Sequence, residues 1–249
     1  MSVSNLKMLF TCCCFSMLFL FYGRAPKART MPEYQDSLNI ISSLDSYKNT
    51  TMWDKSQQLI ELQQYLTPFY TDFKYATTTN FTGKVLYKNP KAYLRLPAAM
   101  ALQTVLNQLN SNGLTLKIYD AYRPYSVTKQ MWNYVPDPRY AADPAKGSGH
   151  NRGAAVDVTL VRLNTGEELE MPTVFDDFTE KAHHNCMNLP KAAIANRALL
   201  RSAMEKAGFV ALETEWWHYS LPKAASRFRL MDLSFDQLDS LPLKNNLNH

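Results

Sequence analysis

Residues 148–161, SGHNRGAAVDVTLV, run from a polar, glycine-containing loop directly into an apolar segment. The short, β-branched stretch from Ala154 to Val161 predicts a buried strand. Side chains alternate along a strand, so Asp157 points to the face opposite Val156 and Val158. A carboxylate within an apolar strand is costly unless it is paired or binds a metal ion.

His150 precedes this strand in the same segment, so an imidazole and a carboxylate lie close in the sequence. Both groups are ordinary metal ligands. A turn cap or an ion pair with Arg152 would also explain Asp157. Taken alone, the segment leaves a metal site and a structural role equally open.

Helix and strand patterns alternate on both sides of this segment and predict one α+β domain, with helices beside a small, mainly antiparallel sheet. The expected helices cover Asp54, as N-cap, to about Leu66, Pro97 to about Ser111, Ser126 to Tyr134, and about Ala193 to Ala207. The other expected strands cover residues 114–119, 209–212 and 216–221. The last 25 or so residues turn polar, and we expect them to wrap the surface.

Composition narrows the class of protein. The chain has 249 residues, 46% of them hydrophobic, which argues against a mostly disordered chain. Three of its 4 cysteines are adjacent, at positions 12–14, which excludes a disulfide scaffold. Residues 1–30 hold four basic and no acidic side chains, so the remaining 219 residues hold 23 basic and 22 acidic ones. A body so nearly neutral argues against a nucleic-acid partner.

The N-terminus is typical of a targeting segment. Lys7 precedes 16 uncharged residues, Met8 to Gly23. That run is closer to the roughly 7–15 residues of a secretory core than to the roughly 20 of a spanning helix. We predict a signal peptide or signal anchor over 1–25, a linker or arm over 26–50, and the folded domain over 51–249. The protein is then expected to be bacterial and exported, either periplasmic or membrane-anchored facing the periplasm, with membrane attachment only through this segment.

A second group of candidate residues lies in 213–219, ETEWWHY. His218 is a candidate metal ligand and Glu215 is a candidate general base. The same residues would also be expected in a strand that only contributes aromatic side chains to the core. On a regular strand these two side chains point to opposite faces. Both reach one ion only if Glu215 lies in the turn before the strand, or if the strand bulges. We expect the turn.

Residues 119–124, YDAYRP, end the expected strand with an arginine that Pro124 holds in place. Arg123 is therefore a candidate for binding a carboxylate or a developing oxyanion. A surface ion pair is the commoner role for such an arginine. His183 and His184 are adjacent, so their side chains diverge, and we interpret them as a loop or helix-end pair.

These clusters, in this order, resemble the zinc D-alanyl-D-alanine dipeptidases of the VanX type, which are related to a wider D,D-carboxypeptidase and Hedgehog-like fold group. The family's S-x-H-x-x-G-x-A-x-D motif is present at 148–157, its E-W-W-H-Y at 215–219 and its Y-R-P at 122–124. The likeness extends from about residue 70 to about residue 222. It implies a zinc peptidase domain over 51–249 with its metal site at the sheet.

The resemblance also implies a role for each site residue. One Zn²⁺ ion per chain would be held by three ligands, which are His150, Asp157 and His218. Glu215 would act as general acid and base, and Arg123 would stabilise the oxyanion. Two further residues would line the substrate pocket, Tyr75 and Ser148.

The implied reaction is hydrolysis of the D-alanyl-D-alanine dipeptide. An export-like N-terminus favours turnover of cell-wall dipeptide over a cytoplasmic resistance role. Pro172 replaces the glycine that the family has after Met171, so the substrate loop differs. One alternative is a zinc D,D- or L,D-carboxypeptidase or endopeptidase that acts on peptidoglycan stem peptides. Another is a zinc-stabilised binding module without turnover.

Overall fold

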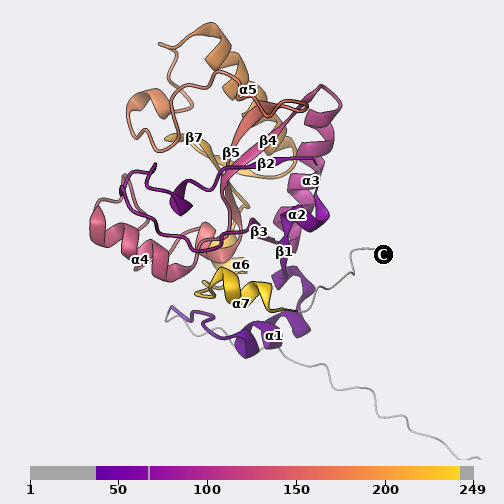
Figure 1. The fold of residues 1–249 in the computed structure, drawn as a ribbon, viewed down its shortest axis with the longest axis vertical. Coiled ribbons are helices and arrows are strands. Elements are labelled where there is room, and N and C mark those ends of the chain that lie inside the picture. The colour runs from indigo at the N-terminus through magenta and orange to yellow at the C-terminus, as the bar shows by residue number, and fades with distance from the viewer. Residues whose placement is uncertain (1–37, 67, 242–249) are drawn as a thin grey trace, which may run out of the picture. The chain divides into compact units, whose positions relative to one another are not determined.

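The computed structural model describes residues 38–66 and 68–241. Within them, five strands form one sheet in the order β2-β4-β5-β7-β6 (Figure 1). Only β2 and β4 pair in parallel, so the sheet is mainly antiparallel as predicted. The strands are β2 (Tyr70–Thr71), β4 (Leu114–Asp120), β5 (Ala155–Arg162), β6 (Val210–Leu212) and β7 (Glu215–Ser220).

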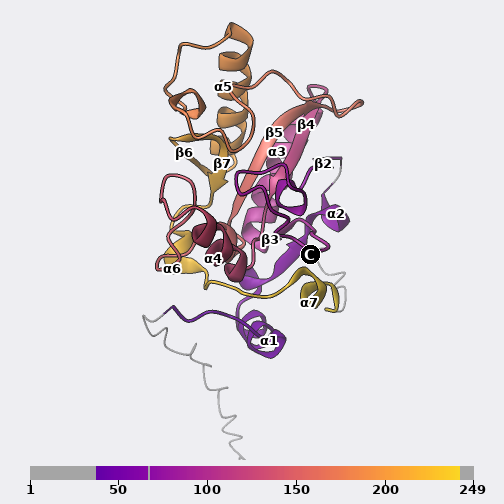
Figure 2. The same ribbon diagram turned by 60° about the vertical axis from the view of Figure 1, so that its left-hand side comes forward.

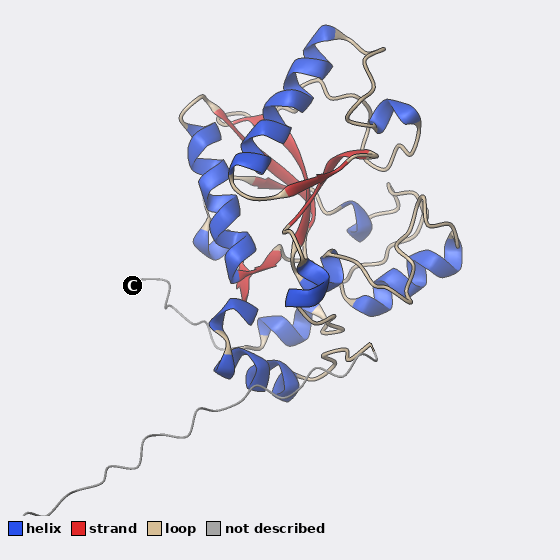
Figure 3. Cartoon of the chain, turned by 180° about the vertical axis from the view of Figure 1, so that it is seen from behind, coloured by secondary structure: helices blue, strands red, loops and turns tan. Residues whose placement is uncertain are grey.

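One face of this sheet carries the main hydrophobic core. Helices α3 (Leu96–Asn110) and α5 (Lys191–Lys206) lie across that face, as Figure 3 shows from behind. Leu106 of α3 and Leu200 of α5 are buried together with Val158 of β5. Proline at the second position of α3 suits the first turn of a helix, where its missing N–H has no intrahelical partner. The helices and strands expected here are confirmed, with ends shifted by one or two residues.

The opposite face of the sheet is covered by loops. Tyr119 of β4 points to this side, where its ring packs against Phe175 at 4.9 Å between centroids. The amine of Lys74, in the 3₁₀ helix Lys74–Ala76, lies 5.1 Å from the same ring. Helix α4 (Tyr125–Tyr134), labelled in Figure 2, is the next element of the chain after β4 and is joined to it by residues 121–124. Asp157 faces this loop-covered side, which is where the site forms.

The helix predicted from Asp54 to Leu66 is wrong. Helix α1 (Leu44–Trp53) ends at Asp54, whose carboxylate instead caps a 3₁₀ turn at Lys55–Gln57. Strand β1 (Leu59–Glu61) and the short helix α2 (Leu62–Tyr65) follow. Strand β1 pairs with β3 (Tyr93–Arg95) in a separate two-stranded sheet of the described residues. Pairing with a distant strand has overridden the local leucine spacing.

A second core joins the two ends of the described chain. Ile41 pairs with Met231, and both side chains are fully buried. Leu233 and Phe235 of the C-terminal segment, which also contains α6 (Ala224–Arg227) and α7 (Phe235–Asp239), lie in the same cluster. The expected polar surface wrap is therefore wrong, because its apolar residues are buried. Of the linker predicted over 26–50, Ile41 lies in this cluster and residues 44–50 belong to helix α1.

The targeting segment predicted over 1–25 lies outside the described residues. Among the residues that are described, no helix is both long and apolar enough to span a bilayer.

Candidate metal centre and active site

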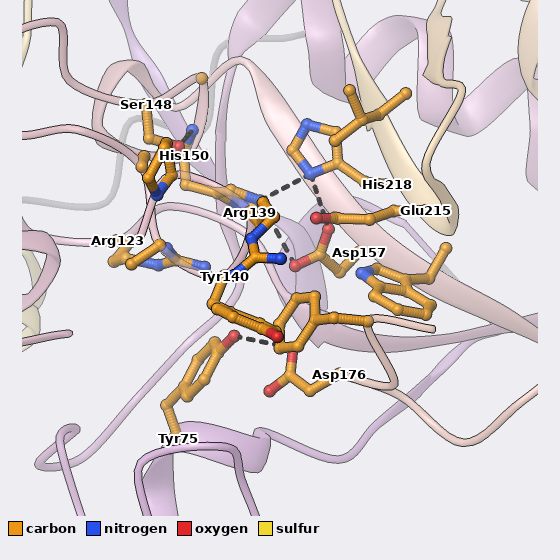
Figure 4. Close-up of a pocket in the computed structure, with 17 residues that line it drawn as sticks. Tyr75, Arg123, Arg139, Tyr140, Ser148, His150, Asp157, Asp176, Glu215 and His218 are labelled. Atoms are coloured by element: carbon orange, nitrogen blue, oxygen red, sulfur yellow. Dashed lines mark hydrogen bonds and ion pairs between the residues drawn. The ribbon is translucent and has the colours of Figure 1, made fainter. Parts of the chain in front are cut away.

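Three potential metal ligands converge on the loop-covered face of the sheet (Figure 4). Asp157 of β5 and His218 of β7 are directly opposed across the two strands, and His150 lies in the 3₁₀ turn before β5. His218 Nδ1 lies 2.9 Å from Asp157 Oδ1, and His150 Nε2 lies 3.3 Å from Asp157 Oδ2. The two imidazole nitrogens are 3.2 Å apart. All ligand atoms are within 4.8 Å of one another.

The donor chemistry of this cluster fits a metal ion. His150 Nδ1 lies 2.7 Å from the Ala121 carbonyl oxygen, to which it can donate, so the lone pair of Nε2 faces the cluster. Burial alone would raise the pKa of Asp157, but the imidazoles of His150 and His218 hold that pKa well below its usual range. An ionised carboxylate beside two imidazole nitrogens is the donor set that zinc and similar divalent ions accept.

Buried hydrogen bonds fix the loop that carries His150. The Asn151 amide donates to the Arg123 carbonyl and to Thr128 Oγ1, at 2.9 and 2.8 Å. Gly153 ends the turn with φ of +65°, and the Arg95 backbone N–H donates to its carbonyl at 2.7 Å. A residue with a side chain is rarely found at this φ. The glycine of the sequence motif thus sets the angle at which the loop enters β5.

Glu215 is the first residue of β7, so its predicted place in the preceding turn is wrong. The register of β6 against β7 shifts between Ala211 and Leu212, which pairs Leu212 with Glu215. This irregularity is the bulge alternative, and it lets Glu215 and His218 line one pocket despite being three residues apart. Burial raises the pKa of Glu215 above its ordinary value, and the negative charge of Asp157 adds to that effect.

Arg123 is buried, so the surface ion pair is also wrong as a description of this residue. Its Nε and Nη2 both donate to Asp120 Oδ2, at 2.9 and 2.7 Å. The other oxygen, Oδ1, accepts a hydrogen bond from Tyr87 Oη at 2.7 Å. The guanidinium carbon lies 5.0 Å from the centre of the Tyr75 ring. These contacts hold a permanent cation in a fixed orientation beside the cluster.

One cavity of about 260 Å³ brings the predicted site residues together. That is slightly below the roughly 300–1,000 Å³ typical of pockets for drug-sized ligands, so its size suits a small ligand. The predicted residues that line it are Tyr75, Arg123, Ser148, His150, Asp157, Glu215 and His218. Five elements or loops that are distant in sequence therefore meet at this cavity.

Asp176 also lines this cavity, and no role was predicted for it from the sequence. Its Oδ1 accepts a hydrogen bond from Tyr75 Oη at 3.2 Å, whereas Oδ2 is buried with no partner among the described residues. Its backbone has φ of +60°, a strained angle for an aspartate. Burial raises the pKa of Asp176 well above its usual range, with the charge of Asp157 next in effect. The one sequence signal that could have found it is the pair Phe175-Asp176, which also resembles a segment of the dipeptidase family.

The adjacent histidines stay outside the cluster, as expected. His183 ends the 3₁₀ helix Glu180–Ala182, and the His184 ring packs edge-on against Tyr219 at 6.2 Å. Burial lowers the pKa of His184 to about 4, so this imidazole is neutral at physiological pH. Its role is structural.

Comparisons with known proteins agree with this geometry. The sequence profile of the Peptidase_M15 family, described as D-ala-D-ala dipeptidase, matches residues 55–237. The D-alanyl-D-alanine dipeptidase of Escherichia coli (strain K12) is 39% identical over 175 residues, which cover 70% of this chain and 90% of that protein. The D-alanyl-D-alanine dipeptidase of Enterococcus faecalis (strain ATCC 700802 / V583) is 35% identical over 172 residues, with 60% of this chain and 84% of that protein covered. The matched segment contains every predicted site residue.

Proposed function

The chain belongs to the Peptidase_M15 family of D-ala-D-ala dipeptidases, and on that basis we propose that it is a zinc metallopeptidase that hydrolyses D-alanyl-D-alanine. The observation that carries the proposal is the convergence of a metal-ligand cluster, a buried carboxyl group and a buried guanidinium on one small cavity. Metal-assisted hydrolysis of a peptide bond uses all three kinds of group, for activating the water, transferring its proton and stabilising the oxyanion.

The ligands for the ion would be His150, Asp157 and His218. Three protein ligands leave an open position, as a catalytic zinc site requires. When bound there, zinc supplies Lewis acidity that polarises a carbonyl and lowers the pKa of a coordinated water toward about 7. One ion per chain is expected, because the described residues offer one such cluster.

Glu215 would move the proton. Its carboxyl group lies in the same cavity as the three ligands, where it can accept a proton from the attacking water and later pass it to the leaving amine. Its raised pKa brings the group closer to the pH at which it must both accept and release a proton.

Arg123 would stabilise the negative charge that develops on the carbonyl oxygen. Because Asp120 already fixes its guanidinium, little reorganisation is needed when that charge forms. Removal of one such donor typically costs about 3–4 kcal/mol of transition-state stabilisation.

The free amine of the dipeptide would be bound by Asp176. Its Oδ2 is a buried acceptor without a partner among the described residues, and an ammonium group would supply that hydrogen bond and stabilise the ionised carboxylate. Tyr75 orients this carboxyl group from its other oxygen, and Ser148 lines the same cavity. Recognition of a terminal amine favours a dipeptidase over an enzyme that trims longer stem peptides.

The test is release of D-alanine from D-alanyl-D-alanine by purified, zinc-loaded protein, beside a pentapeptide that ends in D-Ala-D-Ala. Cleavage of the free dipeptide alone supports the proposal. Cleavage of the pentapeptide would instead indicate a carboxypeptidase or endopeptidase.

Removal of the metal gives the second arm of this test. Chelation should abolish hydrolysis, and zinc should restore it. Binding of zinc without turnover of either substrate would indicate a binding module.

We further propose that the protein is exported and acts on dipeptide released during cell-wall turnover. The support is the basic residue and 16-residue uncharged run at the N-terminus. Cell fractionation, with the intact mass of the recovered protein, tests this. Recovery of the full-length chain in the cytoplasm would contradict it, and the mass would distinguish a cleaved signal peptide from a retained anchor.

A further inference from the structure

The lining of the cavity holds two arginines among the described residues, and they differ in surroundings. Arg123 is buried and its Nε and Nη2 are both committed to Asp120. Arg139 lies on the loop between α4 and the His150 turn, and its side chain is 76% exposed. Because it is exposed and still lines the cavity, Arg139 marks the edge of the pocket. Figure 4 draws its guanidinium across the ligand cluster.

Local contacts hold Arg139 in place. Its Nε lies 3.0 Å from both oxygens of Asp137, and its Nη2 donates to Oδ2 at 2.5 Å. The Arg139 backbone N–H donates to Asp137 Oδ1 at 2.9 Å, so the carboxylate binds both ends of the residue. The guanidinium carbon also lies 5.3 Å from the centre of the Tyr140 ring. The side chain is therefore oriented before any ligand arrives.

Donors remain on this guanidinium. Its described hydrogen bonds use Nε and Nη2, and no partner for Nη1 occurs among the described residues. Arginine presents five N–H groups in a planar fork that matches a carboxylate. A second carboxylate can thus bind the free edge of the Arg139 guanidinium while Asp137 remains bound to the other edge.

This inference rests on the proposed function. A dipeptide carries one ammonium and one carboxylate group. Asp176 accounts for the ammonium, whereas Arg123 faces the reacting carbonyl. We propose that Arg139 selects substrates with a free C-terminal carboxylate by binding that group at the edge of the pocket.

The experiment compares D-alanyl-D-alanine with D-alanyl-D-alaninamide, which lacks the negative charge. Arg139→Gln should lower kcat/KM for the free dipeptide about tenfold, or about 1.4 kcal/mol, mainly through KM. It should leave kcat/KM for the amide unchanged. Arg139→Lys keeps the charge but not the fork, so it should retain part of the preference.

A matched control is Arg162→Gln, which removes an exposed arginine that is paired with Glu167 outside the cavity. This variant should leave the kinetics of both substrates unchanged. Equal loss by Arg139→Gln on the acid and the amide, or no loss on either, would overturn the inference while wild-type hydrolysis still supports the proposed function.

Binding provides a readout that does not need turnover. In the zinc-loaded Glu215→Gln protein, calorimetry should give a weaker Kd for the amide than for the free dipeptide, and adding Arg139→Gln should remove that difference. If wild-type protein fails to hydrolyse the dipeptide but this difference in Kd persists, the proposed function fails and the role of Arg139 stands. The inference would be overturned if the difference in Kd between the two compounds were as large with Arg139→Gln as without it. It would also be overturned if neither compound bound.

Discussion

Three carboxyl groups share one small cavity, and their surroundings push their pKa values in different directions. Two imidazoles keep Asp157 ionised despite its burial. Burial raises the pKa of Glu215 and of Asp176, with the charge of Asp157 adding in both cases. When the pKa values of neighbouring carboxyl groups differ in this way, one group can stay ionised and hold a cation while another carries a proton.

Replacing Glu215 by glutamine should remove proton transfer and leave the metal site intact. The amide keeps the shape of the side chain but cannot accept the proton of water. We expect kcat/KM for D-alanyl-D-alanine to fall by about 10²–10⁴-fold, with bound zinc unchanged by elemental analysis. A variant within about tenfold of wild type would place the proton acceptor elsewhere.

Asp176 makes stability depend on pH in a direction that can be predicted. The unfolded carboxyl group titrates near about 3.9, and the folded pKa is higher. The native protein therefore binds the extra proton between these two values, and stability falls as the pH rises through that window.

Asp176→Asn should remove this dependence. In zinc-free protein at pH 8 the variant should be more stable by on the order of 1 kcal/mol, because asparagine has no carboxyl group whose pKa rises on folding. Urea unfolding from pH 4 to 8 measures the effect. The same variant should lose about 10–100-fold in kcat/KM, since a hydrogen bond to the charged amine is gone. A pH dependence unchanged from wild type would contradict this account of Asp176.

At the scale of elements, the site depends on how the His150 turn enters β5. Gly153 makes this transition with φ of +65°, and a Cβ there would lie 2.7 Å from Leu59 Cδ2 of β1. The small β1–β3 sheet thus packs directly against the turn that carries a ligand. A change at this contact is expected to move His150 relative to Asp157 and His218.

Gly153→Ala should therefore cost both stability and metal affinity. The left-handed angle and the contact with Leu59 together predict a loss of about 2–4 kcal/mol. Gly113→Ala is the matched control, because Gly113 has φ of +71° but no atom within 4 Å of an added Cβ. That variant should lose only about 1–2 kcal/mol. Competition with a zinc indicator should show weaker binding, by roughly tenfold or more, for Gly153→Ala alone. Equal zinc affinity in both variants would show that this contact does not position His150.

At the scale of the whole molecule, the described fold has a second core away from the sheet. Ile41, near the start of the described chain, donates its N–H to the Leu230 carbonyl and accepts from Asp232 N–H. Tyr122, beside the oxyanion candidate, donates its hydroxyl proton to the Leu233 carbonyl in the same cluster. The two ends of the described chain therefore support the loop that holds Arg123.

Ile41→Ala should show that this segment is part of the folded domain. Its side chain is fully buried, so the truncation should destabilise the protein by about 2–4 kcal/mol in urea unfolding. Leu38→Ala is the control, because Leu38 is 44% exposed and its truncation should change stability by less than about 0.5 kcal/mol. Equal effects of the two variants would mean that residues 38–50 act as a linker after all.

The sequence predicted strands β4 to β7 and helices α3, α4 and α5 well, because each carries its own pattern of apolar residues, whereas the two-residue strand β2 was not predicted. Helix α3 and strand β5 are clear examples, with Leu102, Val105 and Leu109 at helical spacing and β-branched residues in the strand. It failed between Asp54 and Leu66. There, Leu59 lies in strand β1 and Leu62 begins the short helix α2, since pairing of β1 with β3 outweighs local preference.

Individual site residues were predicted only where they belong to a motif with fixed spacing. His150, Asp157 and His218 were identified before any geometry was known, and the structure brings their ligand atoms together. Asp176 and Arg139 were missed as site residues. Nothing in the local sequence distinguishes Arg139 from other loop residues, and the resemblance at Phe175-Asp176 assigned Asp176 no role. Only the arrangement of distant loops places them on one cavity.

The sequence by itself determined the α+β class, the family and the choice of residues proposed as metal ligands, because these depend on short-range periods and on chemistry-bearing residues at fixed spacing. Tertiary structure alone decided the register shift that brings Glu215 to the cavity, the burial of Arg123 and the closure of the second core. The register shift lies between neighbouring strands, and the apolar pattern does not specify the strand pairing that produces it. The burial of Arg123 and the second core result from contacts between segments far apart in the chain, and no local pattern encodes the free energy of such contacts.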